Sequence, residues 1–379
     1  MAPDRPGPPG TRLLLCFPAL SLARKAVRSG LDPWLLADRA HQRVFTPLAG
    51  GRLVLVDPGD EAAVAAAVAR VVRERAITHV LDATGFPVAG VPGPESARAP
   101  HVLADIGELG RVLARSRHPM VRTRVVAAAG DVPAAAAEIG WPVVVRSECE
   151  QTVVWSAPAL ERWLAAPGRR APFAVAEFVA GPEVVTTTLT HDGMHRVVGL
   201  TARRPGAHGV RYLHPAPLPE SAAMAVRAAV TAMLDLVGYE FGPAETTVVL
   251  ADDGPRIVGS RPCFGTRGIP RLIKTATGFD VQTELFRALA GVPVHPPVPR
   301  WFAAVEFFRP FAGRPGDGLP GLRVLAEGAT PEAVEARLDA ARDSVPPTRN
   351  DDCYVRFAGN TVRVEVSGIE DGMDWEQRL

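Results

Sequence analysis

A hinge between two apolar strands constrains the fold of this chain more than any other stretch. Residues 173–183 read F-A-V-A-E-F-V-A-G-P-E, and the run V-V-T-T-T-L that follows is mostly β-branched. The pattern predicts a strand that ends at residues 177–179, a turn at Gly181 and Pro182, and a second strand that begins at Glu183. We therefore expect a strand–turn–strand unit near the middle of the chain.

This hinge allows two interpretations. A hairpin with a Gly-Pro turn explains the run by itself. The alternative is a binding site for the flat base of a nucleotide, with backbone donors and acceptors at the base edge, an apolar wall of Phe178 and Val179, and Glu183 within reach of ribose hydroxyls. Glu177, at the end of the first strand, belongs to the same candidate site. Motifs further along the chain favour the second interpretation.

Composition places the chain among soluble globular proteins. Its 379 residues suffice for two or three packed units, and 47% of them are apolar and 22% charged. The net charge of +1 argues against nucleic acid as a partner, and no apolar run is long enough to span a membrane. Because the N-terminus shows no signal pattern, we expect a cytoplasmic protein. The cysteines match no metal-binding spacing and are expected to be free thiols: Cys16, Cys149, Cys263 and Cys353.

Strands and helices alternate along the first part of the chain. After a Pro- and Gly-rich stretch over residues 1–10, which we expect to be disordered, strands are predicted at residues 13–17, 33–37, 53–56 and 78–82, with helices at 21–29 and 61–74. This alternation predicts a doubly wound parallel α/β domain over residues 11–103. Its first turn lacks the G-x-G-x-x-G spacing, so no dinucleotide site is expected there.

The rest of the chain is expected to form three more units. Over residues 104–183 we predict helices at 106–115, 121–129, 134–139 and 158–166 and a strand at 141–146. Over residues 184–300 we predict strands at 195–201, 246–250 and 255–260, with helices at 221–237, 272–277 and 281–290. Residues 301–379 are richer in strand patterns, with a helix at 331–342, and are expected to pack as a small appended α+β domain.

This order of motifs resembles the ATP-grasp superfamily, in particular its carboxylate–amine ligases, which include D-alanine–D-alanine ligase. The hinge over residues 177–183 is similar to the family's adenine- and ribose-binding hinge, and the strand that ends at Arg146 resembles one that ends in a phosphate-contacting lysine. The runs that begin at Gly242, Gly259 and Ala276 match three further motifs in the family's order. The resemblance extends to about residue 295 and implies an α/β ATP-grasp fold with a central lid lobe and a C-terminal antiparallel lobe.

The resemblance also implies ATP as a cofactor, with Mg²⁺ bridging its phosphates. The family's metal-ligand positions correspond to Thr247, Gly259 and Arg261, none of which is a carboxylate. Glu245 lies two residues before Thr247 and faces the same way on a strand, so it is the candidate metal ligand and a candidate catalytic residue. The phosphate-covering loop is altered as well, because residues 147–152 read S-E-C-E-Q-T, without glycine.

Arginines supply the remaining candidates, in a chain whose lysines are Lys25 and Lys274. Arg146 and Arg117 stand where the family has lysines, which predicts that both bind nucleotide. Arg203 lies where the family has a phosphate-contacting base, with a solvated loop as the alternative. Arg267 lies where the family's loop approaches the acyl-phosphate, and we expect it to bind a substrate carboxylate. Arg203 and Arg267 are therefore the predicted catalytic arginines.

Three functional hypotheses follow. The first is a divergent ATP-grasp ligase that joins a small-molecule carboxylate to an amine through an acyl-phosphate. The second is a degenerate scaffold that binds a nucleotide or metabolite without ligating. The third is a reused cleft with nucleotide-independent chemistry, in which Glu148, Glu150 and Glu245 are candidate acid–base groups. Because dimers are common in the family, a homodimer is a further expectation.

Overall fold

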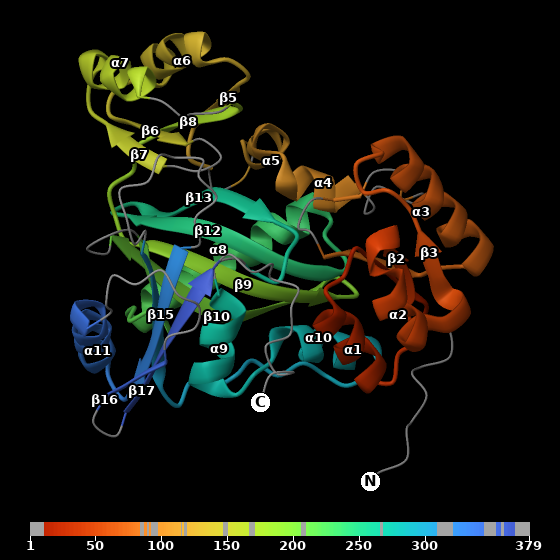
Figure 1. Cartoon of the computed structure of the whole chain (residues 1–379). Coiled ribbons are helices and arrows are strands. Elements are labelled where there is room, and N and C mark those ends of the chain that lie inside the picture. The colour runs from red at the N-terminus through yellow and green to blue at the C-terminus, as the bar shows by residue number, and fades with distance from the viewer. Residues whose placement is uncertain are drawn as a thin grey trace.

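Three sheets organise the chain, and each is built from its own stretch of the sequence (Figure 1). The computed structural model describes residues 11–83, 87–88, 91, 98–114, 116, 120–146, 151–166, 171–205, 210–265, 268–308, 321–344, 354–357 and 360–367.

The first sheet is parallel and has the strand order β3-β2-β1-β4, as the alternating pattern predicts. Its strands are β1 (Leu13–Cys16), β2 (Trp34–Ala37), β3 (Leu53–Leu55) and β4 (His79–Asp82). The connecting helices are α1 (Leu20–Arg28), α2 (Gln42–Ala49) and α3 (Glu61–Arg75). No helix was predicted at α2, which contains Pro47. Asp60 caps α3 by accepting a hydrogen bond from the Ala63 N–H.

Two helices lead from this unit to the next. They are α4 (Ala99–Ala104) and α5 (Ile106–Leu113). Asp105 caps α5, because its carboxylate accepts hydrogen bonds from the N–H groups of Gly107 and Glu108. Both helices pack their apolar faces against the largest sheet, not against the first one.

The central lobe is an antiparallel sheet covered by two helices (Figure 1). Its strands β5 (Thr123–Val126), β6 (Val143–Arg146), β7 (Gln151–Val154) and β8 (Phe173–Glu177) run in the order β5-β8-β6-β7, and its helices are α6 (Val132–Ile139) and α7 (Ala157–Ala165). The predicted helix over residues 121–129 is wrong. Residues 123–126 of this stretch form β5, because this mostly β-branched run pairs with β8, where Thr123 lies opposite Ala176.

The third sheet is antiparallel and has nine strands in the order β13-β12-β9-β10-β11-β14-β15-β17-β16. The strands before residue 300 are β9 (Glu183–His191), β10 (Met194–Pro205), β11 (Val210–His214), β12 (Gly242–Ala251) and β13 (Gly254–Arg261). Its helices are α8 (Glu220–Val237), α9 (Ile269–Thr277) and α10 (Val281–Leu289). Gly238 ends α8 in the left-handed conformation, with φ 70° and ψ 40°, as a glycine at that position predicts.

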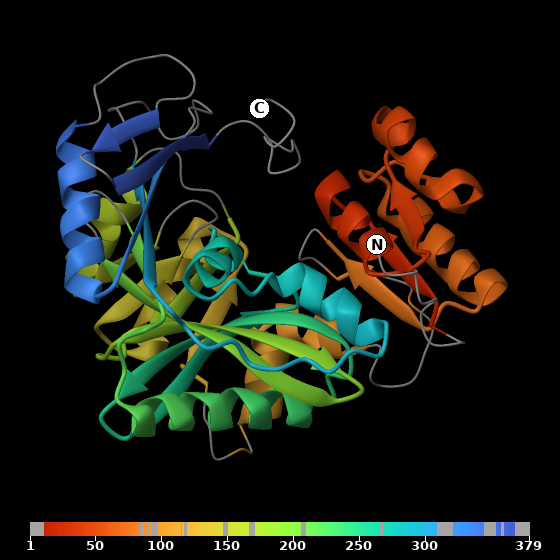
Figure 2. The same ribbon diagram turned by 90° about the horizontal axis from the view of Figure 1, so that it is seen from below.

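Alternate residues of β9 face opposite sides of this sheet. Val184 lies in an apolar core with α8, α4 and α5. Val185 lies in a second core, with α9, α10 and residues of α1 and β1. The second core therefore joins the N-terminal unit to the large sheet, and Figure 2 shows the two side by side.

The tail continues the large sheet. It contains β14 (Phe302–Phe308), β15 (Gly321–Gly328), β16 (Tyr354–Phe357), β17 (Asn360–Ser367) and α11 (Pro331–Ser344). Strand β14 pairs with β11, so that Tyr212 lies opposite Val305. The appended α+β unit expected over residues 301–379 thus shares its sheet with the C-terminal lobe. Among the described residues, no helix combines the length and apolar character needed to cross a membrane.

Candidate functional site

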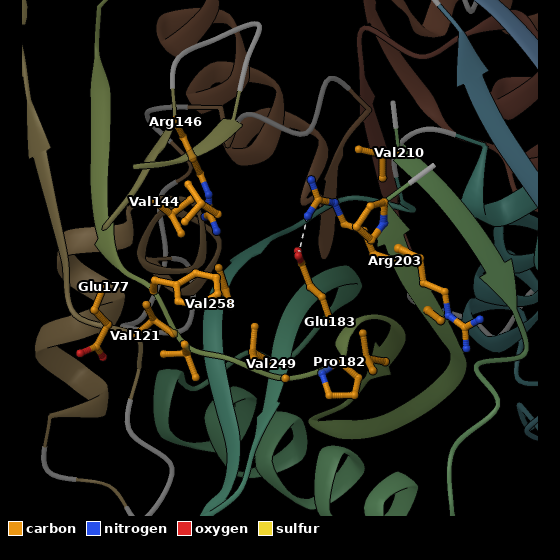
Figure 3. A pocket seen from close by; sticks show the side chains of 18 of the residues that line it. Val121, Val144, Arg146, Glu177, Pro182, Glu183, Arg203, Val210, Val249 and Val258 are labelled. Carbon is orange, nitrogen blue, oxygen red and sulfur yellow. Dashed lines mark hydrogen bonds and ion pairs between the residues drawn. The ribbon is translucent and has the colours of Figure 1, made fainter. Parts of the chain in front are cut away.

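A cavity of about 630 Å³ lies where the central lobe faces the large sheet (Figure 3). Strands β6 and β7 and the hinge contribute residues from one side, and β9, β10, β12 and β13 contribute residues from the other. The size suits a ligand of nucleotide dimensions. Valines from several elements make one part of its wall apolar: Val121, Val144, Val153, Val249 and Val258.

Gly181 fixes the bend of the hinge. Its φ is 145°, and a Cβ atom at this position would lie 2.0 Å from the carbonyl oxygen of Leu250. A glycine is therefore required for the hinge to approach β12 this closely. The Leu250 N–H donates a hydrogen bond of 2.9 Å to the Pro182 carbonyl, which attaches the hinge to the large sheet.

Phe178 and Val179 line the cavity next to these valines. The Phe178 ring packs against Trp155, with ring centroids 5.5 Å apart, and its N–H donates to the Pro142 carbonyl at 3.2 Å. These contacts hold the apolar wall that the hinge motif predicts. Contact of these two side chains with a nucleotide stays a prediction.

Glu177 also lines the cavity, but its carboxylate points away from it (Figure 3). The backbone N–H of Arg122 donates to one carboxylate oxygen at 3.0 Å, and the Arg122 Nε donates to the other at 2.8 Å. In this structure Glu177 therefore fastens β8 to the start of β5. A role in nucleotide binding stays a prediction.

Glu183 and Arg203 form an ion pair inside the cavity, as the dashed line in Figure 3 shows. The Arg203 Nη1 donates to the Glu183 Oε2 at 2.5 Å, and both side chains are mostly buried. Burial opposes the charge of Arg203, but Glu183 and Tyr212 outweigh it and raise the pKa of the guanidinium. Two residues predicted for different roles are thus brought together in one pair.

Arg146 approaches the same space from β6 (Figure 3). Burial lowers the pKa of its guanidinium, and the nearby charges of Arg203 and Arg261 lower it further, whereas Glu183 acts in the opposite direction. Its Nε is buried and has no hydrogen-bond partner among the residues that the structure describes. A guanidinium with an unsatisfied buried N–H beside two other cations favours an anionic ligand. This part of the cavity is therefore suited to bind phosphate.

The positions implied for a metal do not fit magnesium. Thr247 lies opposite Gly259, and Arg261 lies opposite Glu245 in the β12–β13 pairing. Magnesium prefers oxygen ligands, and proteins usually supply carboxylates for it. None of the three implied positions holds a carboxylate. Of the described cavity-lining residues, the carboxylates are Glu177 and Glu183, and both are paired with arginines.

Glu245 is buried on β12 and lies outside the cavity lining. A Cβ atom at Gly265 would lie 3.4 Å from its Oε2, so the carboxylate faces the loop that follows β13. The other predicted residues, Arg117 and Arg267, lie outside the described residues, as do Glu148 and Glu150. Their predicted roles stay predictions.

Sequence reasoning missed Arg122 and gave Arg204 no assigned role. Arg204 lines the cavity beside Arg203 and pairs with Glu335 of α11 at 2.9 Å. Arg122 could have been found if residues 121–129 had been interpreted as a strand, because it precedes a β-branched run that pairs with the strand of Glu177.

No protein-family model and no curated protein matches this chain. Solved structures do match it over most of its length. An L-amino acid ligase from Bacillus licheniformis superposes with a TM-score of 0.64 at 17% identity, covering 88% of this chain and 97% of that one. N5-carboxyaminoimidazole ribonucleotide synthetase from Thermus thermophilus gives a TM-score of 0.61 at 16% identity, covering 89% of this chain and 100% of that one.

The chain has the ATP-grasp fold. A further ATP-grasp structure, the biotin carboxylase domain of a 2-oxoglutarate carboxylase from Hydrogenobacter thermophilus, was solved with MgADP. It has a TM-score of 0.57 at 11% identity and covers 95% of this chain and 91% of that one. The predicted ATP-grasp fold class is therefore confirmed. At these identities the likeness concerns the fold, and the chemistry must be argued from this chain's own residues.

Proposed function

We propose that this chain is an ATP-dependent ligase that joins a small carboxylic acid to an amine. The observation that supports this best is the division of the 630 Å³ cavity into an apolar part beside the hinge and a cationic part. A purine base suits the apolar wall, and its phosphates suit Arg146 and Arg203. Two similar folds belong to an L-amino acid ligase and a ribonucleotide synthetase, which is consistent with ligase chemistry.

The proposed reaction has two steps. A carboxylate oxygen attacks the γ-phosphorus of ATP while the bond from that phosphorus to the β–γ bridging oxygen breaks, and ADP leaves with the electron pair. The amine nitrogen then attacks the acyl carbon, the bond from that carbon to the phosphate oxygen breaks, and the proton of the nitrogen passes to solvent. Arg146 and Arg203 would offset the repulsion between the two reacting anions and stabilise the transferred phosphoryl group.

No step is assigned to magnesium, because Thr247, Gly259 and Arg261 do not form a site for it. The positive charge that offsets the phosphates is assigned to this chain's own arginines. Arg261, whose charge acts on Arg146, adds to the cationic end. Glu183 keeps Arg203 in place before the nucleotide binds and can accept hydrogen bonds from ribose hydroxyls once it is bound.

Titration calorimetry with ATP, ADP and adenosine tests the binding step. We expect affinity to rise with the number of phosphates, and a chelator to change the affinity for ATP by less than about twofold. Arg146→Gln should weaken ATP binding by about tenfold or more, because it removes a charge-assisted hydrogen bond, and should leave adenosine binding unchanged. Arg287→Gln, which removes an exposed arginine paired with Glu284 on α10, is the matched control. Failure of the wild-type protein to bind ATP at millimolar concentration would refute the proposal.

A second candidate function is a nucleotide-binding scaffold that does not ligate. The three implied metal-ligand positions, Thr247, Gly259 and Arg261, hold no carboxylate, and this favours a protein that does not ligate. Phosphate release measured across pairs of amino acids separates the two candidates, with the coupled product identified by mass spectrometry. ATP binding without phosphate release for any pair would replace the ligase by the scaffold.

A further inference from the structure

A group of metal-binding side chains lies away from the nucleotide cavity, where the N-terminal unit meets the large sheet. It consists of His79, His191 and Asp192, and one candidate ligand atom from each lies within 4.8 Å of the others. His79 begins β4, and His191 ends β9. The nucleotide site uses none of these residues.

The turn between β9 and β10 places two of the three residues. Asp192 and Gly193 both have positive φ, 51° and 69°, as in the two-residue turns that join adjacent strands. The Gly193 N–H donates to the Glu240 carbonyl at 3.0 Å, which anchors the tip of the hairpin. An aspartate in this conformation is uncommon, and here it carries its carboxylate to within 3.6 Å of the His191 Nδ1.

The ring of His79 is held from two sides. It stacks on the His191 ring, with centroids 6.2 Å apart and an angle of 19° between the planes. The Phe241 ring meets it edge-on, with centroids 4.5 Å apart. The orientation of the His79 imidazole is thus set by packing before any ligand binds.

A hydrogen bond also holds the His79 ring. The Thr78 hydroxyl lies 2.9 Å from the His79 Nδ1, and it accepts from the Arg12 N–H, which fixes the hydroxyl in place. A hydrogen bond to one ring nitrogen is the usual way in which a metal-binding histidine is oriented.

A single divalent cation can be bound by the two stacked imidazoles and by the carboxylate together, because the three side chains meet at one place.

We propose that His79, His191 and Asp192 form a binding site for a divalent transition metal, with zinc as the best match. Two imidazole nitrogens and one carboxylate oxygen are a zinc-type ligand set, whereas magnesium and calcium prefer oxygen ligands alone. Zinc needs its ligand atoms about 3.3 Å apart. The Asp192 side chain is 78% exposed and can bring its carboxylate closer to the two imidazoles by rotation.

Occupation of this site would clamp the N-terminal sheet to the β9–β10 hairpin. His79 also lines a cavity of about 270 Å³ together with Tyr239, Glu240 and Phe241, which gives water or a small molecule access to this side chain. A metal bound by three protein ligands with one open position can be exchanged or can act on a ligand.

The test uses the full chain, stripped with a chelator and titrated calorimetrically with ZnCl₂. We expect one zinc ion per chain in the wild-type protein. Asp192→Asn should weaken binding by about tenfold or more while keeping the turn, because asparagine tolerates the same backbone conformation. His79→Gln should have the same effect. His295→Gln, which alters an exposed histidine outside the cluster, should bind zinc as the wild type does.

A second measurement covers the case in which His79→Gln does not fold. Co²⁺ added to the wild-type protein should produce visible d–d absorption, and Asp192→Asn should reduce or shift it. Zinc should also raise the thermal midpoint of the wild type and of His295→Gln, but not that of Asp192→Asn. Absence of zinc binding in the wild type, or Asp192→Asn binding zinc and Co²⁺ as the wild type does, would overturn the proposal.

Discussion

At the scale of single residues, Arg211 and Glu306 form an ion pair whose burial makes it important for stability. Arg211 on β11 donates through Nε and Nη2 to the Glu306 Oε2 on β14, at 2.9 and 2.5 Å. Its Nη2 also reaches Asp339 of α11 at 2.8 Å. Glu306 is 0% exposed, so the pair is screened little by solvent.

Glu306→Gln should therefore lower the free energy of unfolding by about 3 kcal/mol, because it leaves a largely buried guanidinium with one carboxylate partner in place of two. Urea unfolding of the wild type and the variant measures this. The matched control is Glu335→Gln, which breaks the exposed pair between Arg204 and α11 and should change stability by less than about 1 kcal/mol. Equal effects of the two substitutions would contradict the assignment to burial.

Individual residues of the candidate site could be predicted only as far as the local motif reaches. The hinge motif predicted that Glu183 faces a ligand cavity, and the strand end predicted Arg146. The pairing of Glu183 with Arg203 could not be predicted, because it depends on strand register. Nor could the contact between Glu177 at the end of β8 and Arg122 just before β5, because the two residues are far apart in the sequence.

At the scale of elements, one irregularity in the β9–β10 pairing places that ion pair. Near the turn Val197 lies opposite Thr188, but Gly199 lies opposite Thr187, so the register shifts by one residue. Without this bulge Glu183 would face Ala202, whereas with it Glu183 faces Arg203. A glycine inside a strand is a known sign of a bulge, and Gly199 was the available signal.

The hinge element yields a second prediction. Gly181→Ala would place its Cβ 2.0 Å from a backbone oxygen that cannot rotate away, so the hinge must move. We expect a loss of stability of about 2–3 kcal/mol together with weaker nucleotide binding. Gly238→Ala is the control, because its φ is also positive but no atom lies within 4 Å of the added Cβ. It should lose about 1 kcal/mol and bind nucleotide normally.

If both glycine variants lose the same stability in urea unfolding and both retain nucleotide binding, the close approach at the hinge has no functional consequence.

Elements were in general easier to predict than their pairing. The hinge strands and the long helix α8 follow from local pattern, whereas β5 was mistaken for a helix because its strand character comes from pairing with β8.

At the scale of the whole molecule, the lysines of the chain converge on one carboxylate. Lys25 of α1 and Lys274 of α9 both contact Asp280, at 2.9 and 3.0 Å. Asp280 also caps α10 by accepting from the Thr283 N–H. The group thus links the N-terminal unit to two helices of the large sheet, alongside the shared apolar core. No local pattern could predict a contact between residues so distant in the sequence.

This link predicts a pH dependence of stability. Burial alone would raise the pKa of Asp280, but Lys25, the Thr283 N–H and Lys274 outweigh it and lower the pKa to about 2. Because the folded-state pKa lies below the ordinary value of 3.8, the stabilisation is complete above that value and is lost as the pH falls toward 2. The shift corresponds to about 2 kcal/mol.

Asp280→Asn isolates this contribution, because asparagine caps a helix as well as aspartate does but cannot pair with the lysines. We expect the variant to be less stable than the wild type by about 2 kcal/mol at neutral pH, and the difference to shrink between pH 4 and 2 in urea unfolding curves. Asp60→Asn changes the corresponding cap of α3, where Asp60 accepts from the Ala63 N–H, and should leave stability at neutral pH nearly unchanged. A difference between Asp280→Asn and the wild type that stays constant down to pH 2 would show that the two lysines do not hold the N-terminal unit through this carboxylate.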